Sequence, residues 1–164
     1  MKRRPVMLAI DPGKVCGVAY YVRGVFRSHE FPHIDTIPWV RGIILGQPDH
    51  SELNIVCERF TTGGGASKKT RQSSALEVIG AVGAMVDELN TPHKIITFGL
   101  QPVAEAKKLG TTETLKRIDW WNATRDGHAN DAARHILFGL LRMYPEELER
   151  VLQGHTISEN AIAD

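Results

Sequence analysis

An aspartate ends the first apolar run of the chain, immediately before a sharp turn. Residues 8–10 are Leu-Ala-Ile, Asp11 follows, and Pro12-Gly13 then leads into a second apolar run that begins at Gly17. Proline followed by glycine is typical of a chain reversal. The pattern predicts two antiparallel strands with a carboxylate where they meet. Asp11 has two interpretations at this point, because an aspartate before Pro-Gly also stabilises the turn itself.

The hydrophobic pattern of the whole chain predicts one α/β domain. Apolar runs of strand length predict an antiparallel meander and two later strands, at residues 5–10, 17–22, 25–31, 53–57 and 94–98. Helical spacing predicts a short helix near residues 39–44, a long one over 72–90, two short ones within 101–122 broken at Gly110, an amphipathic one over 132–141, and one at 145–152. We therefore expect a mixed five-stranded sheet, antiparallel and parallel, flanked by helices. Trp120 and Trp121 are expected to lie in the hydrophobic core and to cover it, and not to stack on bases.

Composition limits the class of protein. With 164 residues, of which 42% are hydrophobic, the chain fits one domain, which we place at residues 1–144, followed by an acidic helix and frayed tail at 145–164. The two cysteines, Cys16 and Cys57, fall in or beside expected strands, which favours buried, reduced thiols and a cytoplasmic protein. We expect no membrane span and no signal segment. Residues 1–144 hold 19 of the 20 Lys and Arg, which suits a polyanionic partner.

A second acid ends a buried-type strand at Glu58. Glutamate is a poor strand residue, and no turn follows here for it to stabilise, so a functional role is favoured. Arg59 and Phe60 come next, followed by a glycine-rich loop whose basic residues are Lys68, Lys69 and Arg71.

The glycine-rich loop does not match a nucleotide-binding loop, which needs glycine directly before Lys-Thr where this chain has Lys68. A cationic loop beside a carboxylate site is better suited to a nucleic-acid backbone. We therefore expect no nucleotide cofactor. Further basic residues, Lys107, Lys108 and Lys116, lie on the two short helices and either bind DNA or form a solvated face.

A histidine and an aspartate share a face near the start of the 132–141 helix. His128 and Asp131 are three residues apart, and such residues are neighbours on a helix. Together with Asp11 and Glu58 they make three carboxylates and an imidazole. Oxygen-rich sets of this kind bind Mg²⁺, and one imidazole shifts the preference toward Mn²⁺. Two such ions per site can catalyse phosphodiester hydrolysis.

Four segments in a fixed order carry a resemblance to a known family. They are Ile-Asp-Pro-Gly at 10–13 with Gly17, Glu58 with Phe60, the helix over 74–84, and His-Ala-Asn-Asp-Ala at 128–132. With them the chain resembles the RuvC-type Holliday junction resolvases, of the ribonuclease H-like nuclease superfamily. The resemblance implies that Asp11, Glu58 and Asp131 bind the metal. It also implies a homodimer that nicks the two opposite strands of branched DNA symmetrically.

The dimer face implied by the resemblance is the small-sided part of the long helix, at Gly80, Gly83 and Ala84. The chain departs from many relatives at His128, where they carry aspartate. Asp126 is then either a substitute acid or a helix cap. Phe60 matches an aromatic residue that wedges at the junction, although the glycine-rich run beside it is longer than expected.

Other functions stay open on the sequence alone. The same fold serves endonucleases that cut flaps or replication forks and nucleases that process RNA. A junction-binding protein without catalysis is a non-enzyme alternative, which the intact acids disfavour. Actin-like and sugar-kinase ATPases also open with an acid and glycine at a strand turn, but they need two such domains and a longer chain.

Overall fold

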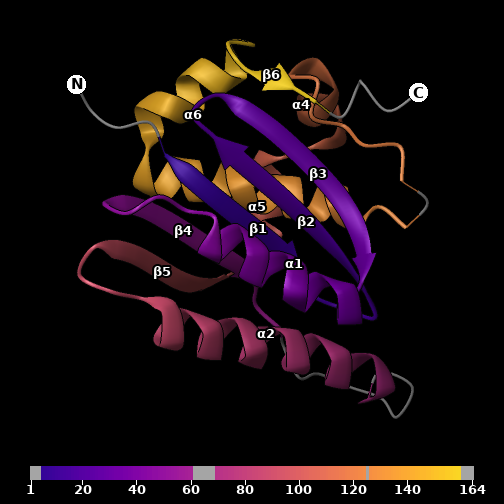
Figure 1. Cartoon of the computed structure of the whole chain (residues 1–164). Helices are drawn as coiled ribbons and strands as arrows, with labels where there is room; N and C mark the ends of the chain where they lie inside the picture. Colours follow the sequence, from indigo (N-terminus) through magenta and orange to yellow (C-terminus); the bar gives the residue numbers. More distant parts are fainter. Residues whose placement is uncertain (1–4, 61–68, 125, 160–164) are drawn as a thin grey trace.

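The antiparallel meander forms the middle of one sheet, as predicted. The computed structural model describes residues 5–60, 69–124 and 126–159 (Figure 1). Strands β1 (Val6–Asp11), β2 (Val15–Val22) and β3 (Val25–Pro32) pair antiparallel, while β4 (Ser51–Glu58) runs parallel to β1 and β5 (Lys94–Gln101) parallel to β4. The expected mixed sheet is confirmed.

The sheet has six strands, where five were expected. Strand β6 (Ile157–Ser158) adds to β3 in parallel, giving the order β5-β4-β1-β2-β3-β6. The prediction missed β6 because a strand of two residues has no hydrophobic period to detect. The frayed tail predicted after residue 152 is therefore wrong for residues 157 and 158, and residues 160–164 lie outside the described residues.

The helices follow the predicted order. Their bounds are α1 (His33–Leu45), α2 (Lys69–Leu89), α3 (Val103–Leu109), α4 (Thr112–Arg117), α5 (His128–Met143) and α6 (Pro145–Leu152). Helix α1 is longer than the short helix expected, because Pro32 stands at its N-cap and the helix continues through Pro38. The break between α3 and α4 falls at Gly110, as predicted.

Alternation along the strands divides the core into two layers. Leu8 and Ile10 of β1 pack with α1 and α2 on one face, whereas Met7 and Ala9 pack with α5 on the other. In Figure 1, α1 and α5 accordingly lie on opposite sides of the sheet. Because side chains alternate along a strand, Asp11 has the same orientation as Met7 and Ala9. The acid therefore belongs to the α5 face.

The C-terminal segment packs on the same domain. Leu148 and Val151 of α6 are buried in the α5 layer, and the hydroxyl of Tyr21 donates to the Glu147 carboxylate at 2.6 Å. Trp120 is fully buried and stacks on Phe26. Trp121 is partly buried against that cluster, so the predicted core and cover roles of the two tryptophans are confirmed.

Both cysteines are buried and unbridged, as expected. Within residues 5–60, 69–124 and 126–159, no helix is long and apolar enough to cross a bilayer.

One glycine allows α5 to contact the sheet. Gly17 of β2 pairs with Asp11 of β1, and a Cβ at Gly17 would lie only 1.8 Å from the carbonyl oxygen of His128. No side chain fits in that space. The first turn of α5 therefore rests on the bare backbone of β2, directly beside Asp11.

Replacing Gly17 by alanine is expected to destabilise the fold by about 1–3 kcal/mol or more, because backbone atoms of α5 must move to admit the methyl group. The free energy of unfolding from chemical denaturation measures the effect. Gly42→Ala is the control, since a Cβ there has open space in helix α1. It is expected to stabilise the protein by up to about 1 kcal/mol. Equal stability of the two variants would contradict the close contact at Gly17.

Candidate active site at the edge of the sheet

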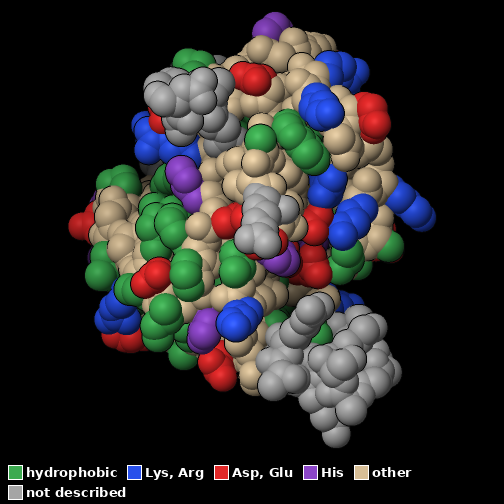
Figure 2. Space-filling model, turned by 90° about the vertical axis from the view of Figure 1, so that its right-hand side faces the viewer, with side chains coloured by type: hydrophobic (Ala, Val, Ile, Leu, Met, Phe, Trp, Pro, Cys, Tyr) green, Lys and Arg blue, Asp and Glu red, His purple; other side chains and the backbone are tan. Residues whose placement is uncertain are grey.

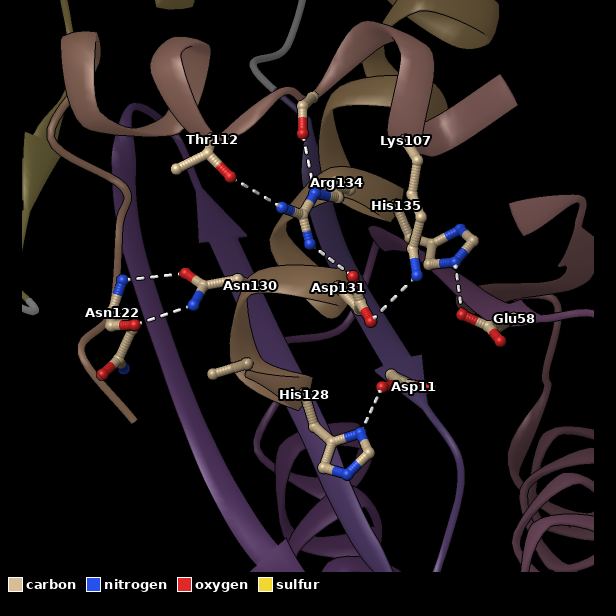
Figure 3. A network of polar contacts seen from close by, with 12 residues as sticks. Asp11, Glu58, Lys107, Thr112, Asn122, His128, Asn130, Asp131, Arg134 and His135 are labelled. Atoms are coloured by element: carbon tan, nitrogen blue, oxygen red, sulfur yellow. Dashed lines mark hydrogen bonds and ion pairs between the residues drawn. The ribbon is translucent and has the colours of Figure 1, made fainter. Parts of the chain in front are cut away.

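The four residues predicted to form the site come from three elements that meet at one edge of the sheet, namely the edge where strands β1 and β4 end. Asp11 ends β1 and Glu58 ends β4, and these strands are parallel neighbours with Ile10 opposite Cys57. Both acid side chains point to the face of the sheet that α5 covers. His128 and Asp131 lie in the first turn of α5, and Figure 3 shows all four side chains around the same space.

Asp11 and His128 form a direct pair. The Nδ1 of His128 lies 2.7 Å from Oδ2 of Asp11. Burial raises the pKa of Asp11 above its usual range, the hydrogen bond from His128 opposes this, and the charges of Glu58 and Asp131 raise it further. The bond to Asp11 in turn raises the pKa of the His128 imidazole. The two side chains are therefore hydrogen-bond partners where β1 ends.

Asp131 is held by two cations. One carboxylate oxygen accepts from Nη1 of Arg134, and the other lies 3.4 Å from Nζ of Lys107. Arg134 is anchored in turn, because its Nε donates to the carbonyl of Gly110 at 2.7 Å. Lys107, predicted to contact DNA, therefore lies beside a site acid in this structure.

Glu58 contacts a histidine that the sequence analysis did not identify. The Nε2 of His135 lies 3.3 Å from Oε2 of Glu58, and its Nδ1 lies 2.9 Å from Oε1 of Gln101. A usable signal existed, since positions 128, 131 and 135 follow the spacing of one helical face. His135 was missed because nothing in the sequence shows that it reaches Glu58, which is 77 residues away.

The start of α5 is fixed from both sides. The Glu30 carboxylate accepts from the backbone N–H of Ala129 at 3.1 Å and from the hydroxyl of Thr124 at 2.7 Å. Asn130 bonds to the backbone of Asn122 through both its side-chain oxygen and its nitrogen. Glu30 also pairs with Gly17 in the sheet, so Asp11, Gly17 and Glu30 form one row across three strands below the helix start.

The donor set is suited to a hard divalent cation. Three carboxylates and one imidazole are ligands that Mg²⁺ and Mn²⁺ take. Burial is the main cause of the raised pKa of Asp11, and the negative charges of Glu58 and Asp131 add to it. Among the described residues, no three acidic, histidine or cysteine side chains have the spacing of a metal site. Asp11 contacts His128, and Asp131 contacts Arg134 and Lys107.

The predicted DNA-contacting residues come from several elements. Arg59 and Phe60 follow β4, and the backbone N–H of Arg59 donates to the carbonyl of Gln101. Lys107 and Lys108 are exposed on α3, and the Nζ of Lys116 lies 5.4 Å from the ring centre of Trp121. Lys68 lies outside the described residues, whereas Lys69 and Arg71 fall within α2. The face in Figure 2 has acidic, basic and histidine side chains beside one another.

The remaining predicted residues are Asp126 and the small residues of α2. Asp126 is exposed and precedes Gly127, the N-cap of α5. Gly80 and Ala84 are exposed on α2. Gly83 is half-buried, and a Cβ there would contact the ring of Phe98 at 3.6 Å.

The Asp11→Asn variant is expected to lower the pKa of His128, because the hydrogen bond to Asp11 is the main cause of its elevation. NMR titration of the imidazole without divalent metal measures this. His29 is the internal control, since burial lowers its pKa and Asp11 is not among the causes. An unchanged His128 titration in Asp11→Asn would contradict the pair.

Comparison with known proteins identifies the fold. No protein-family model and no curated protein sequence matches the chain. Among solved structures, it is similar to Thermus thermophilus RuvC in complex with a Holliday junction substrate, with a TM-score of 0.54 and 15% identity over 86% of this chain and 97% of that one. A second structure of Thermus thermophilus RuvC matches with a TM-score of 0.47 and 16% identity over 84% and 96% of the two chains. The chain therefore has the ribonuclease H-like fold of RuvC.

Proposed function

We propose that this protein is a divalent-metal-dependent endonuclease that hydrolyses phosphodiesters in branched DNA, with the four-way Holliday junction as its preferred substrate. The observation that carries the proposal is the meeting of Asp11, Glu58 and Asp131 at one edge of a RuvC-type sheet. The similar structure is described as a complex with a Holliday junction substrate. Because identity to it is only 15%, the site residues, and not this similarity, support the proposed activity.

The residues that would hold metal are Asp11, Glu58, His128 and Asp131. Two Mg²⁺ or Mn²⁺ ions bound there would supply a nucleophilic water at neutral pH and neutralise charge on the leaving oxygen. The exposure of the two paired residues is compatible with metal binding. Asp11 is only 7% exposed, whereas the side chain of His128 is 37% exposed. His128 can then exchange its bond to Asp11 for another partner while the carboxylate stays in place.

Besides its ion pair with Asp131, Lys107 is suited to binding a phosphate of the DNA backbone. Its Nζ contacts Asp131, and its side chain is half exposed, so it can turn toward a backbone phosphate when a cation takes over the charge of Asp131. Arg134 is more buried and is anchored to Gly110, so it stays with Asp131. We further propose DNA contacts for Arg59, Phe60, Lys68, Lys69, Arg71, Lys107, Lys108 and Lys116.

Paired cuts on two strands require two sites, and we propose that two chains associate through the outer face of α2. Gly80 and Ala84 are exposed there, next to the 52% exposed Leu76. Small residues beside an exposed leucine allow close approach of a second helix. Gly83 is a less direct probe, since a larger side chain there would also press on Phe98 of β5.

The central test is cleavage of a labelled four-way junction with Mg²⁺ or Mn²⁺. Asp11→Asn is expected to reduce cutting at least about 100-fold, because charge neutralisation worth several kcal/mol is lost, while junction binding is kept. Asp35→Asn, the same change at an exposed position of α1, is expected to cut as the wild type does. Chelation by EDTA should stop cutting and added metal should restore it.

The cut pattern identifies the substrate class. Symmetric paired nicks support resolvase action. Cuts confined to one strand of flaps or forks favour a broader branched-DNA endonuclease, and cutting of RNA alone favours a processing nuclease. Wild-type levels of cutting by Asp11→Asn, or metal-independent cutting, would refute the mechanism.

The dimer is tested by Gly80→Arg, which is expected to convert a dimer to a monomer in sedimentation experiments because charge and bulk enter the proposed contact. Gly42→Arg is the matched control, since that glycine is also exposed within a helix and has open space around it. A folded dimer in both variants would remove α2 as the contact face.

A further inference from the structure

A buried histidine lies behind the glutamate of the site. His135 is 1% exposed, and its ring extends from the second turn of α5 to the end of β4 (Figure 3). Its Nε2 lies 3.3 Å from Oε2 of Glu58. A carboxylate only accepts hydrogen bonds, so the imidazole donates from Nε2.

The other ring nitrogen is held by the neighbouring strand. Glu58 and Gln101 are partners in the β4–β5 register, so their side chains emerge side by side on the α5 face. Gln101 is 8% exposed, and its amide lies 2.9 Å from Nδ1 of His135. A side-chain amide offers both an acceptor and a donor, so it satisfies Nδ1 in either orientation. The ring is therefore fixed between two adjacent strand ends.

We propose that His135 is a positioning residue for Glu58, with Gln101 fixing its ring. By donating to Oε2 from the buried side, His135 restricts the rotation of a carboxylate that is otherwise partly exposed, and orients it toward the edge where Asp11 and Asp131 lie. The inference rests on the metal-dependent function proposed above. Groups that hold a metal ligand from behind commonly control metal affinity about 10- to 100-fold.

A purely structural role for His135 is the alternative, and two variants separate the roles. His135→Gln carries an amide N–H that reaches the place of Nε2 and so keeps a donor to Glu58. His135→Asn carries the same amide but reaches only the place of Nδ1, beside Gln101. Both variants keep a buried amide, so a structural role predicts similar behaviour. Positioning predicts that His135→Gln resembles the wild type and His135→Asn does not.

Two measurements read out the difference: Mn²⁺ binding without DNA, by calorimetry or electron paramagnetic resonance, and the Mg²⁺ concentration that gives half-maximal junction cutting. In His135→Asn, the Mn²⁺ dissociation constant and the half-maximal Mg²⁺ concentration are both expected to rise about 10- to 100-fold. Ile136→Val is the control, because it perturbs the apolar face of α5 without touching a polar group, and it should leave both values unchanged.

Equal Mn²⁺ affinity in His135→Asn and the wild type would overturn the proposal, as would equal weakening in both amide variants. A wild-type protein that binds Mn²⁺ but cuts no junction would refute the proposed substrate alone, because the affinity comparison still decides the role of His135. A wild-type protein that binds no Mn²⁺ would overturn both proposals.

A further readout needs no folded variant of His135. Long-range ¹H–¹⁵N NMR of the wild type is expected to show a proton on Nε2 of His135 and a shift of its resonance when Mg²⁺ is added. An Nε2 resonance that is unaffected by saturating Mg²⁺ would contradict the coupling between His135, Glu58 and the metal.

Discussion

The close contact between α5 and the sheet at Gly17 is the constraint on which the site depends. Helix α5 carries His128 and Asp131, whereas Asp11 and Glu58 belong to strands. These groups meet only because β2 presents a bare backbone where the helix begins. Glu30 then accepts from the helix N-terminus on the far side of Gly17, where a negative charge also interacts favourably with the helix dipole. Packing and electrostatics thus act on the same turn.

Much of this arrangement could be predicted from local signals. An acid at the end of each buried strand, and a histidine and an aspartate three apart on a helix, are visible in a sequence because strand and helix periods are short. Those rules place Asp11, Glu58, His128 and Asp131 at one edge, and the structure brings them together there. The meander and the break at Gly110 follow from equally local patterns of turn residues and apolar spacing.

The partners of these acids could not be predicted in the same way. Lys107 and Asp131, or His135 and Glu58, are far apart in the chain, and each pairing depends on how helices sit on the sheet. Lys107 was predicted to contact DNA or to be solvated, and His135 was given no role. The sixth strand was also missed, since β6 exists only because the chain returns to pair with β3. Long-range geometry, and not residue type, determines these features.

Helix α5 contributes four polar residues to the site within eight positions, namely His128, Asp131, Arg134 and His135, and its other faces form much of one core layer. A helix held by hydrogen bonds along its length moves as a rigid body. Its apolar residues, which never approach a substrate, therefore set the angle at which every one of those polar groups meets the strand ends. A core substitution that tilts the helix would therefore alter several contacts of the site at once, whereas one that leaves the helix axis in place would alter none of them.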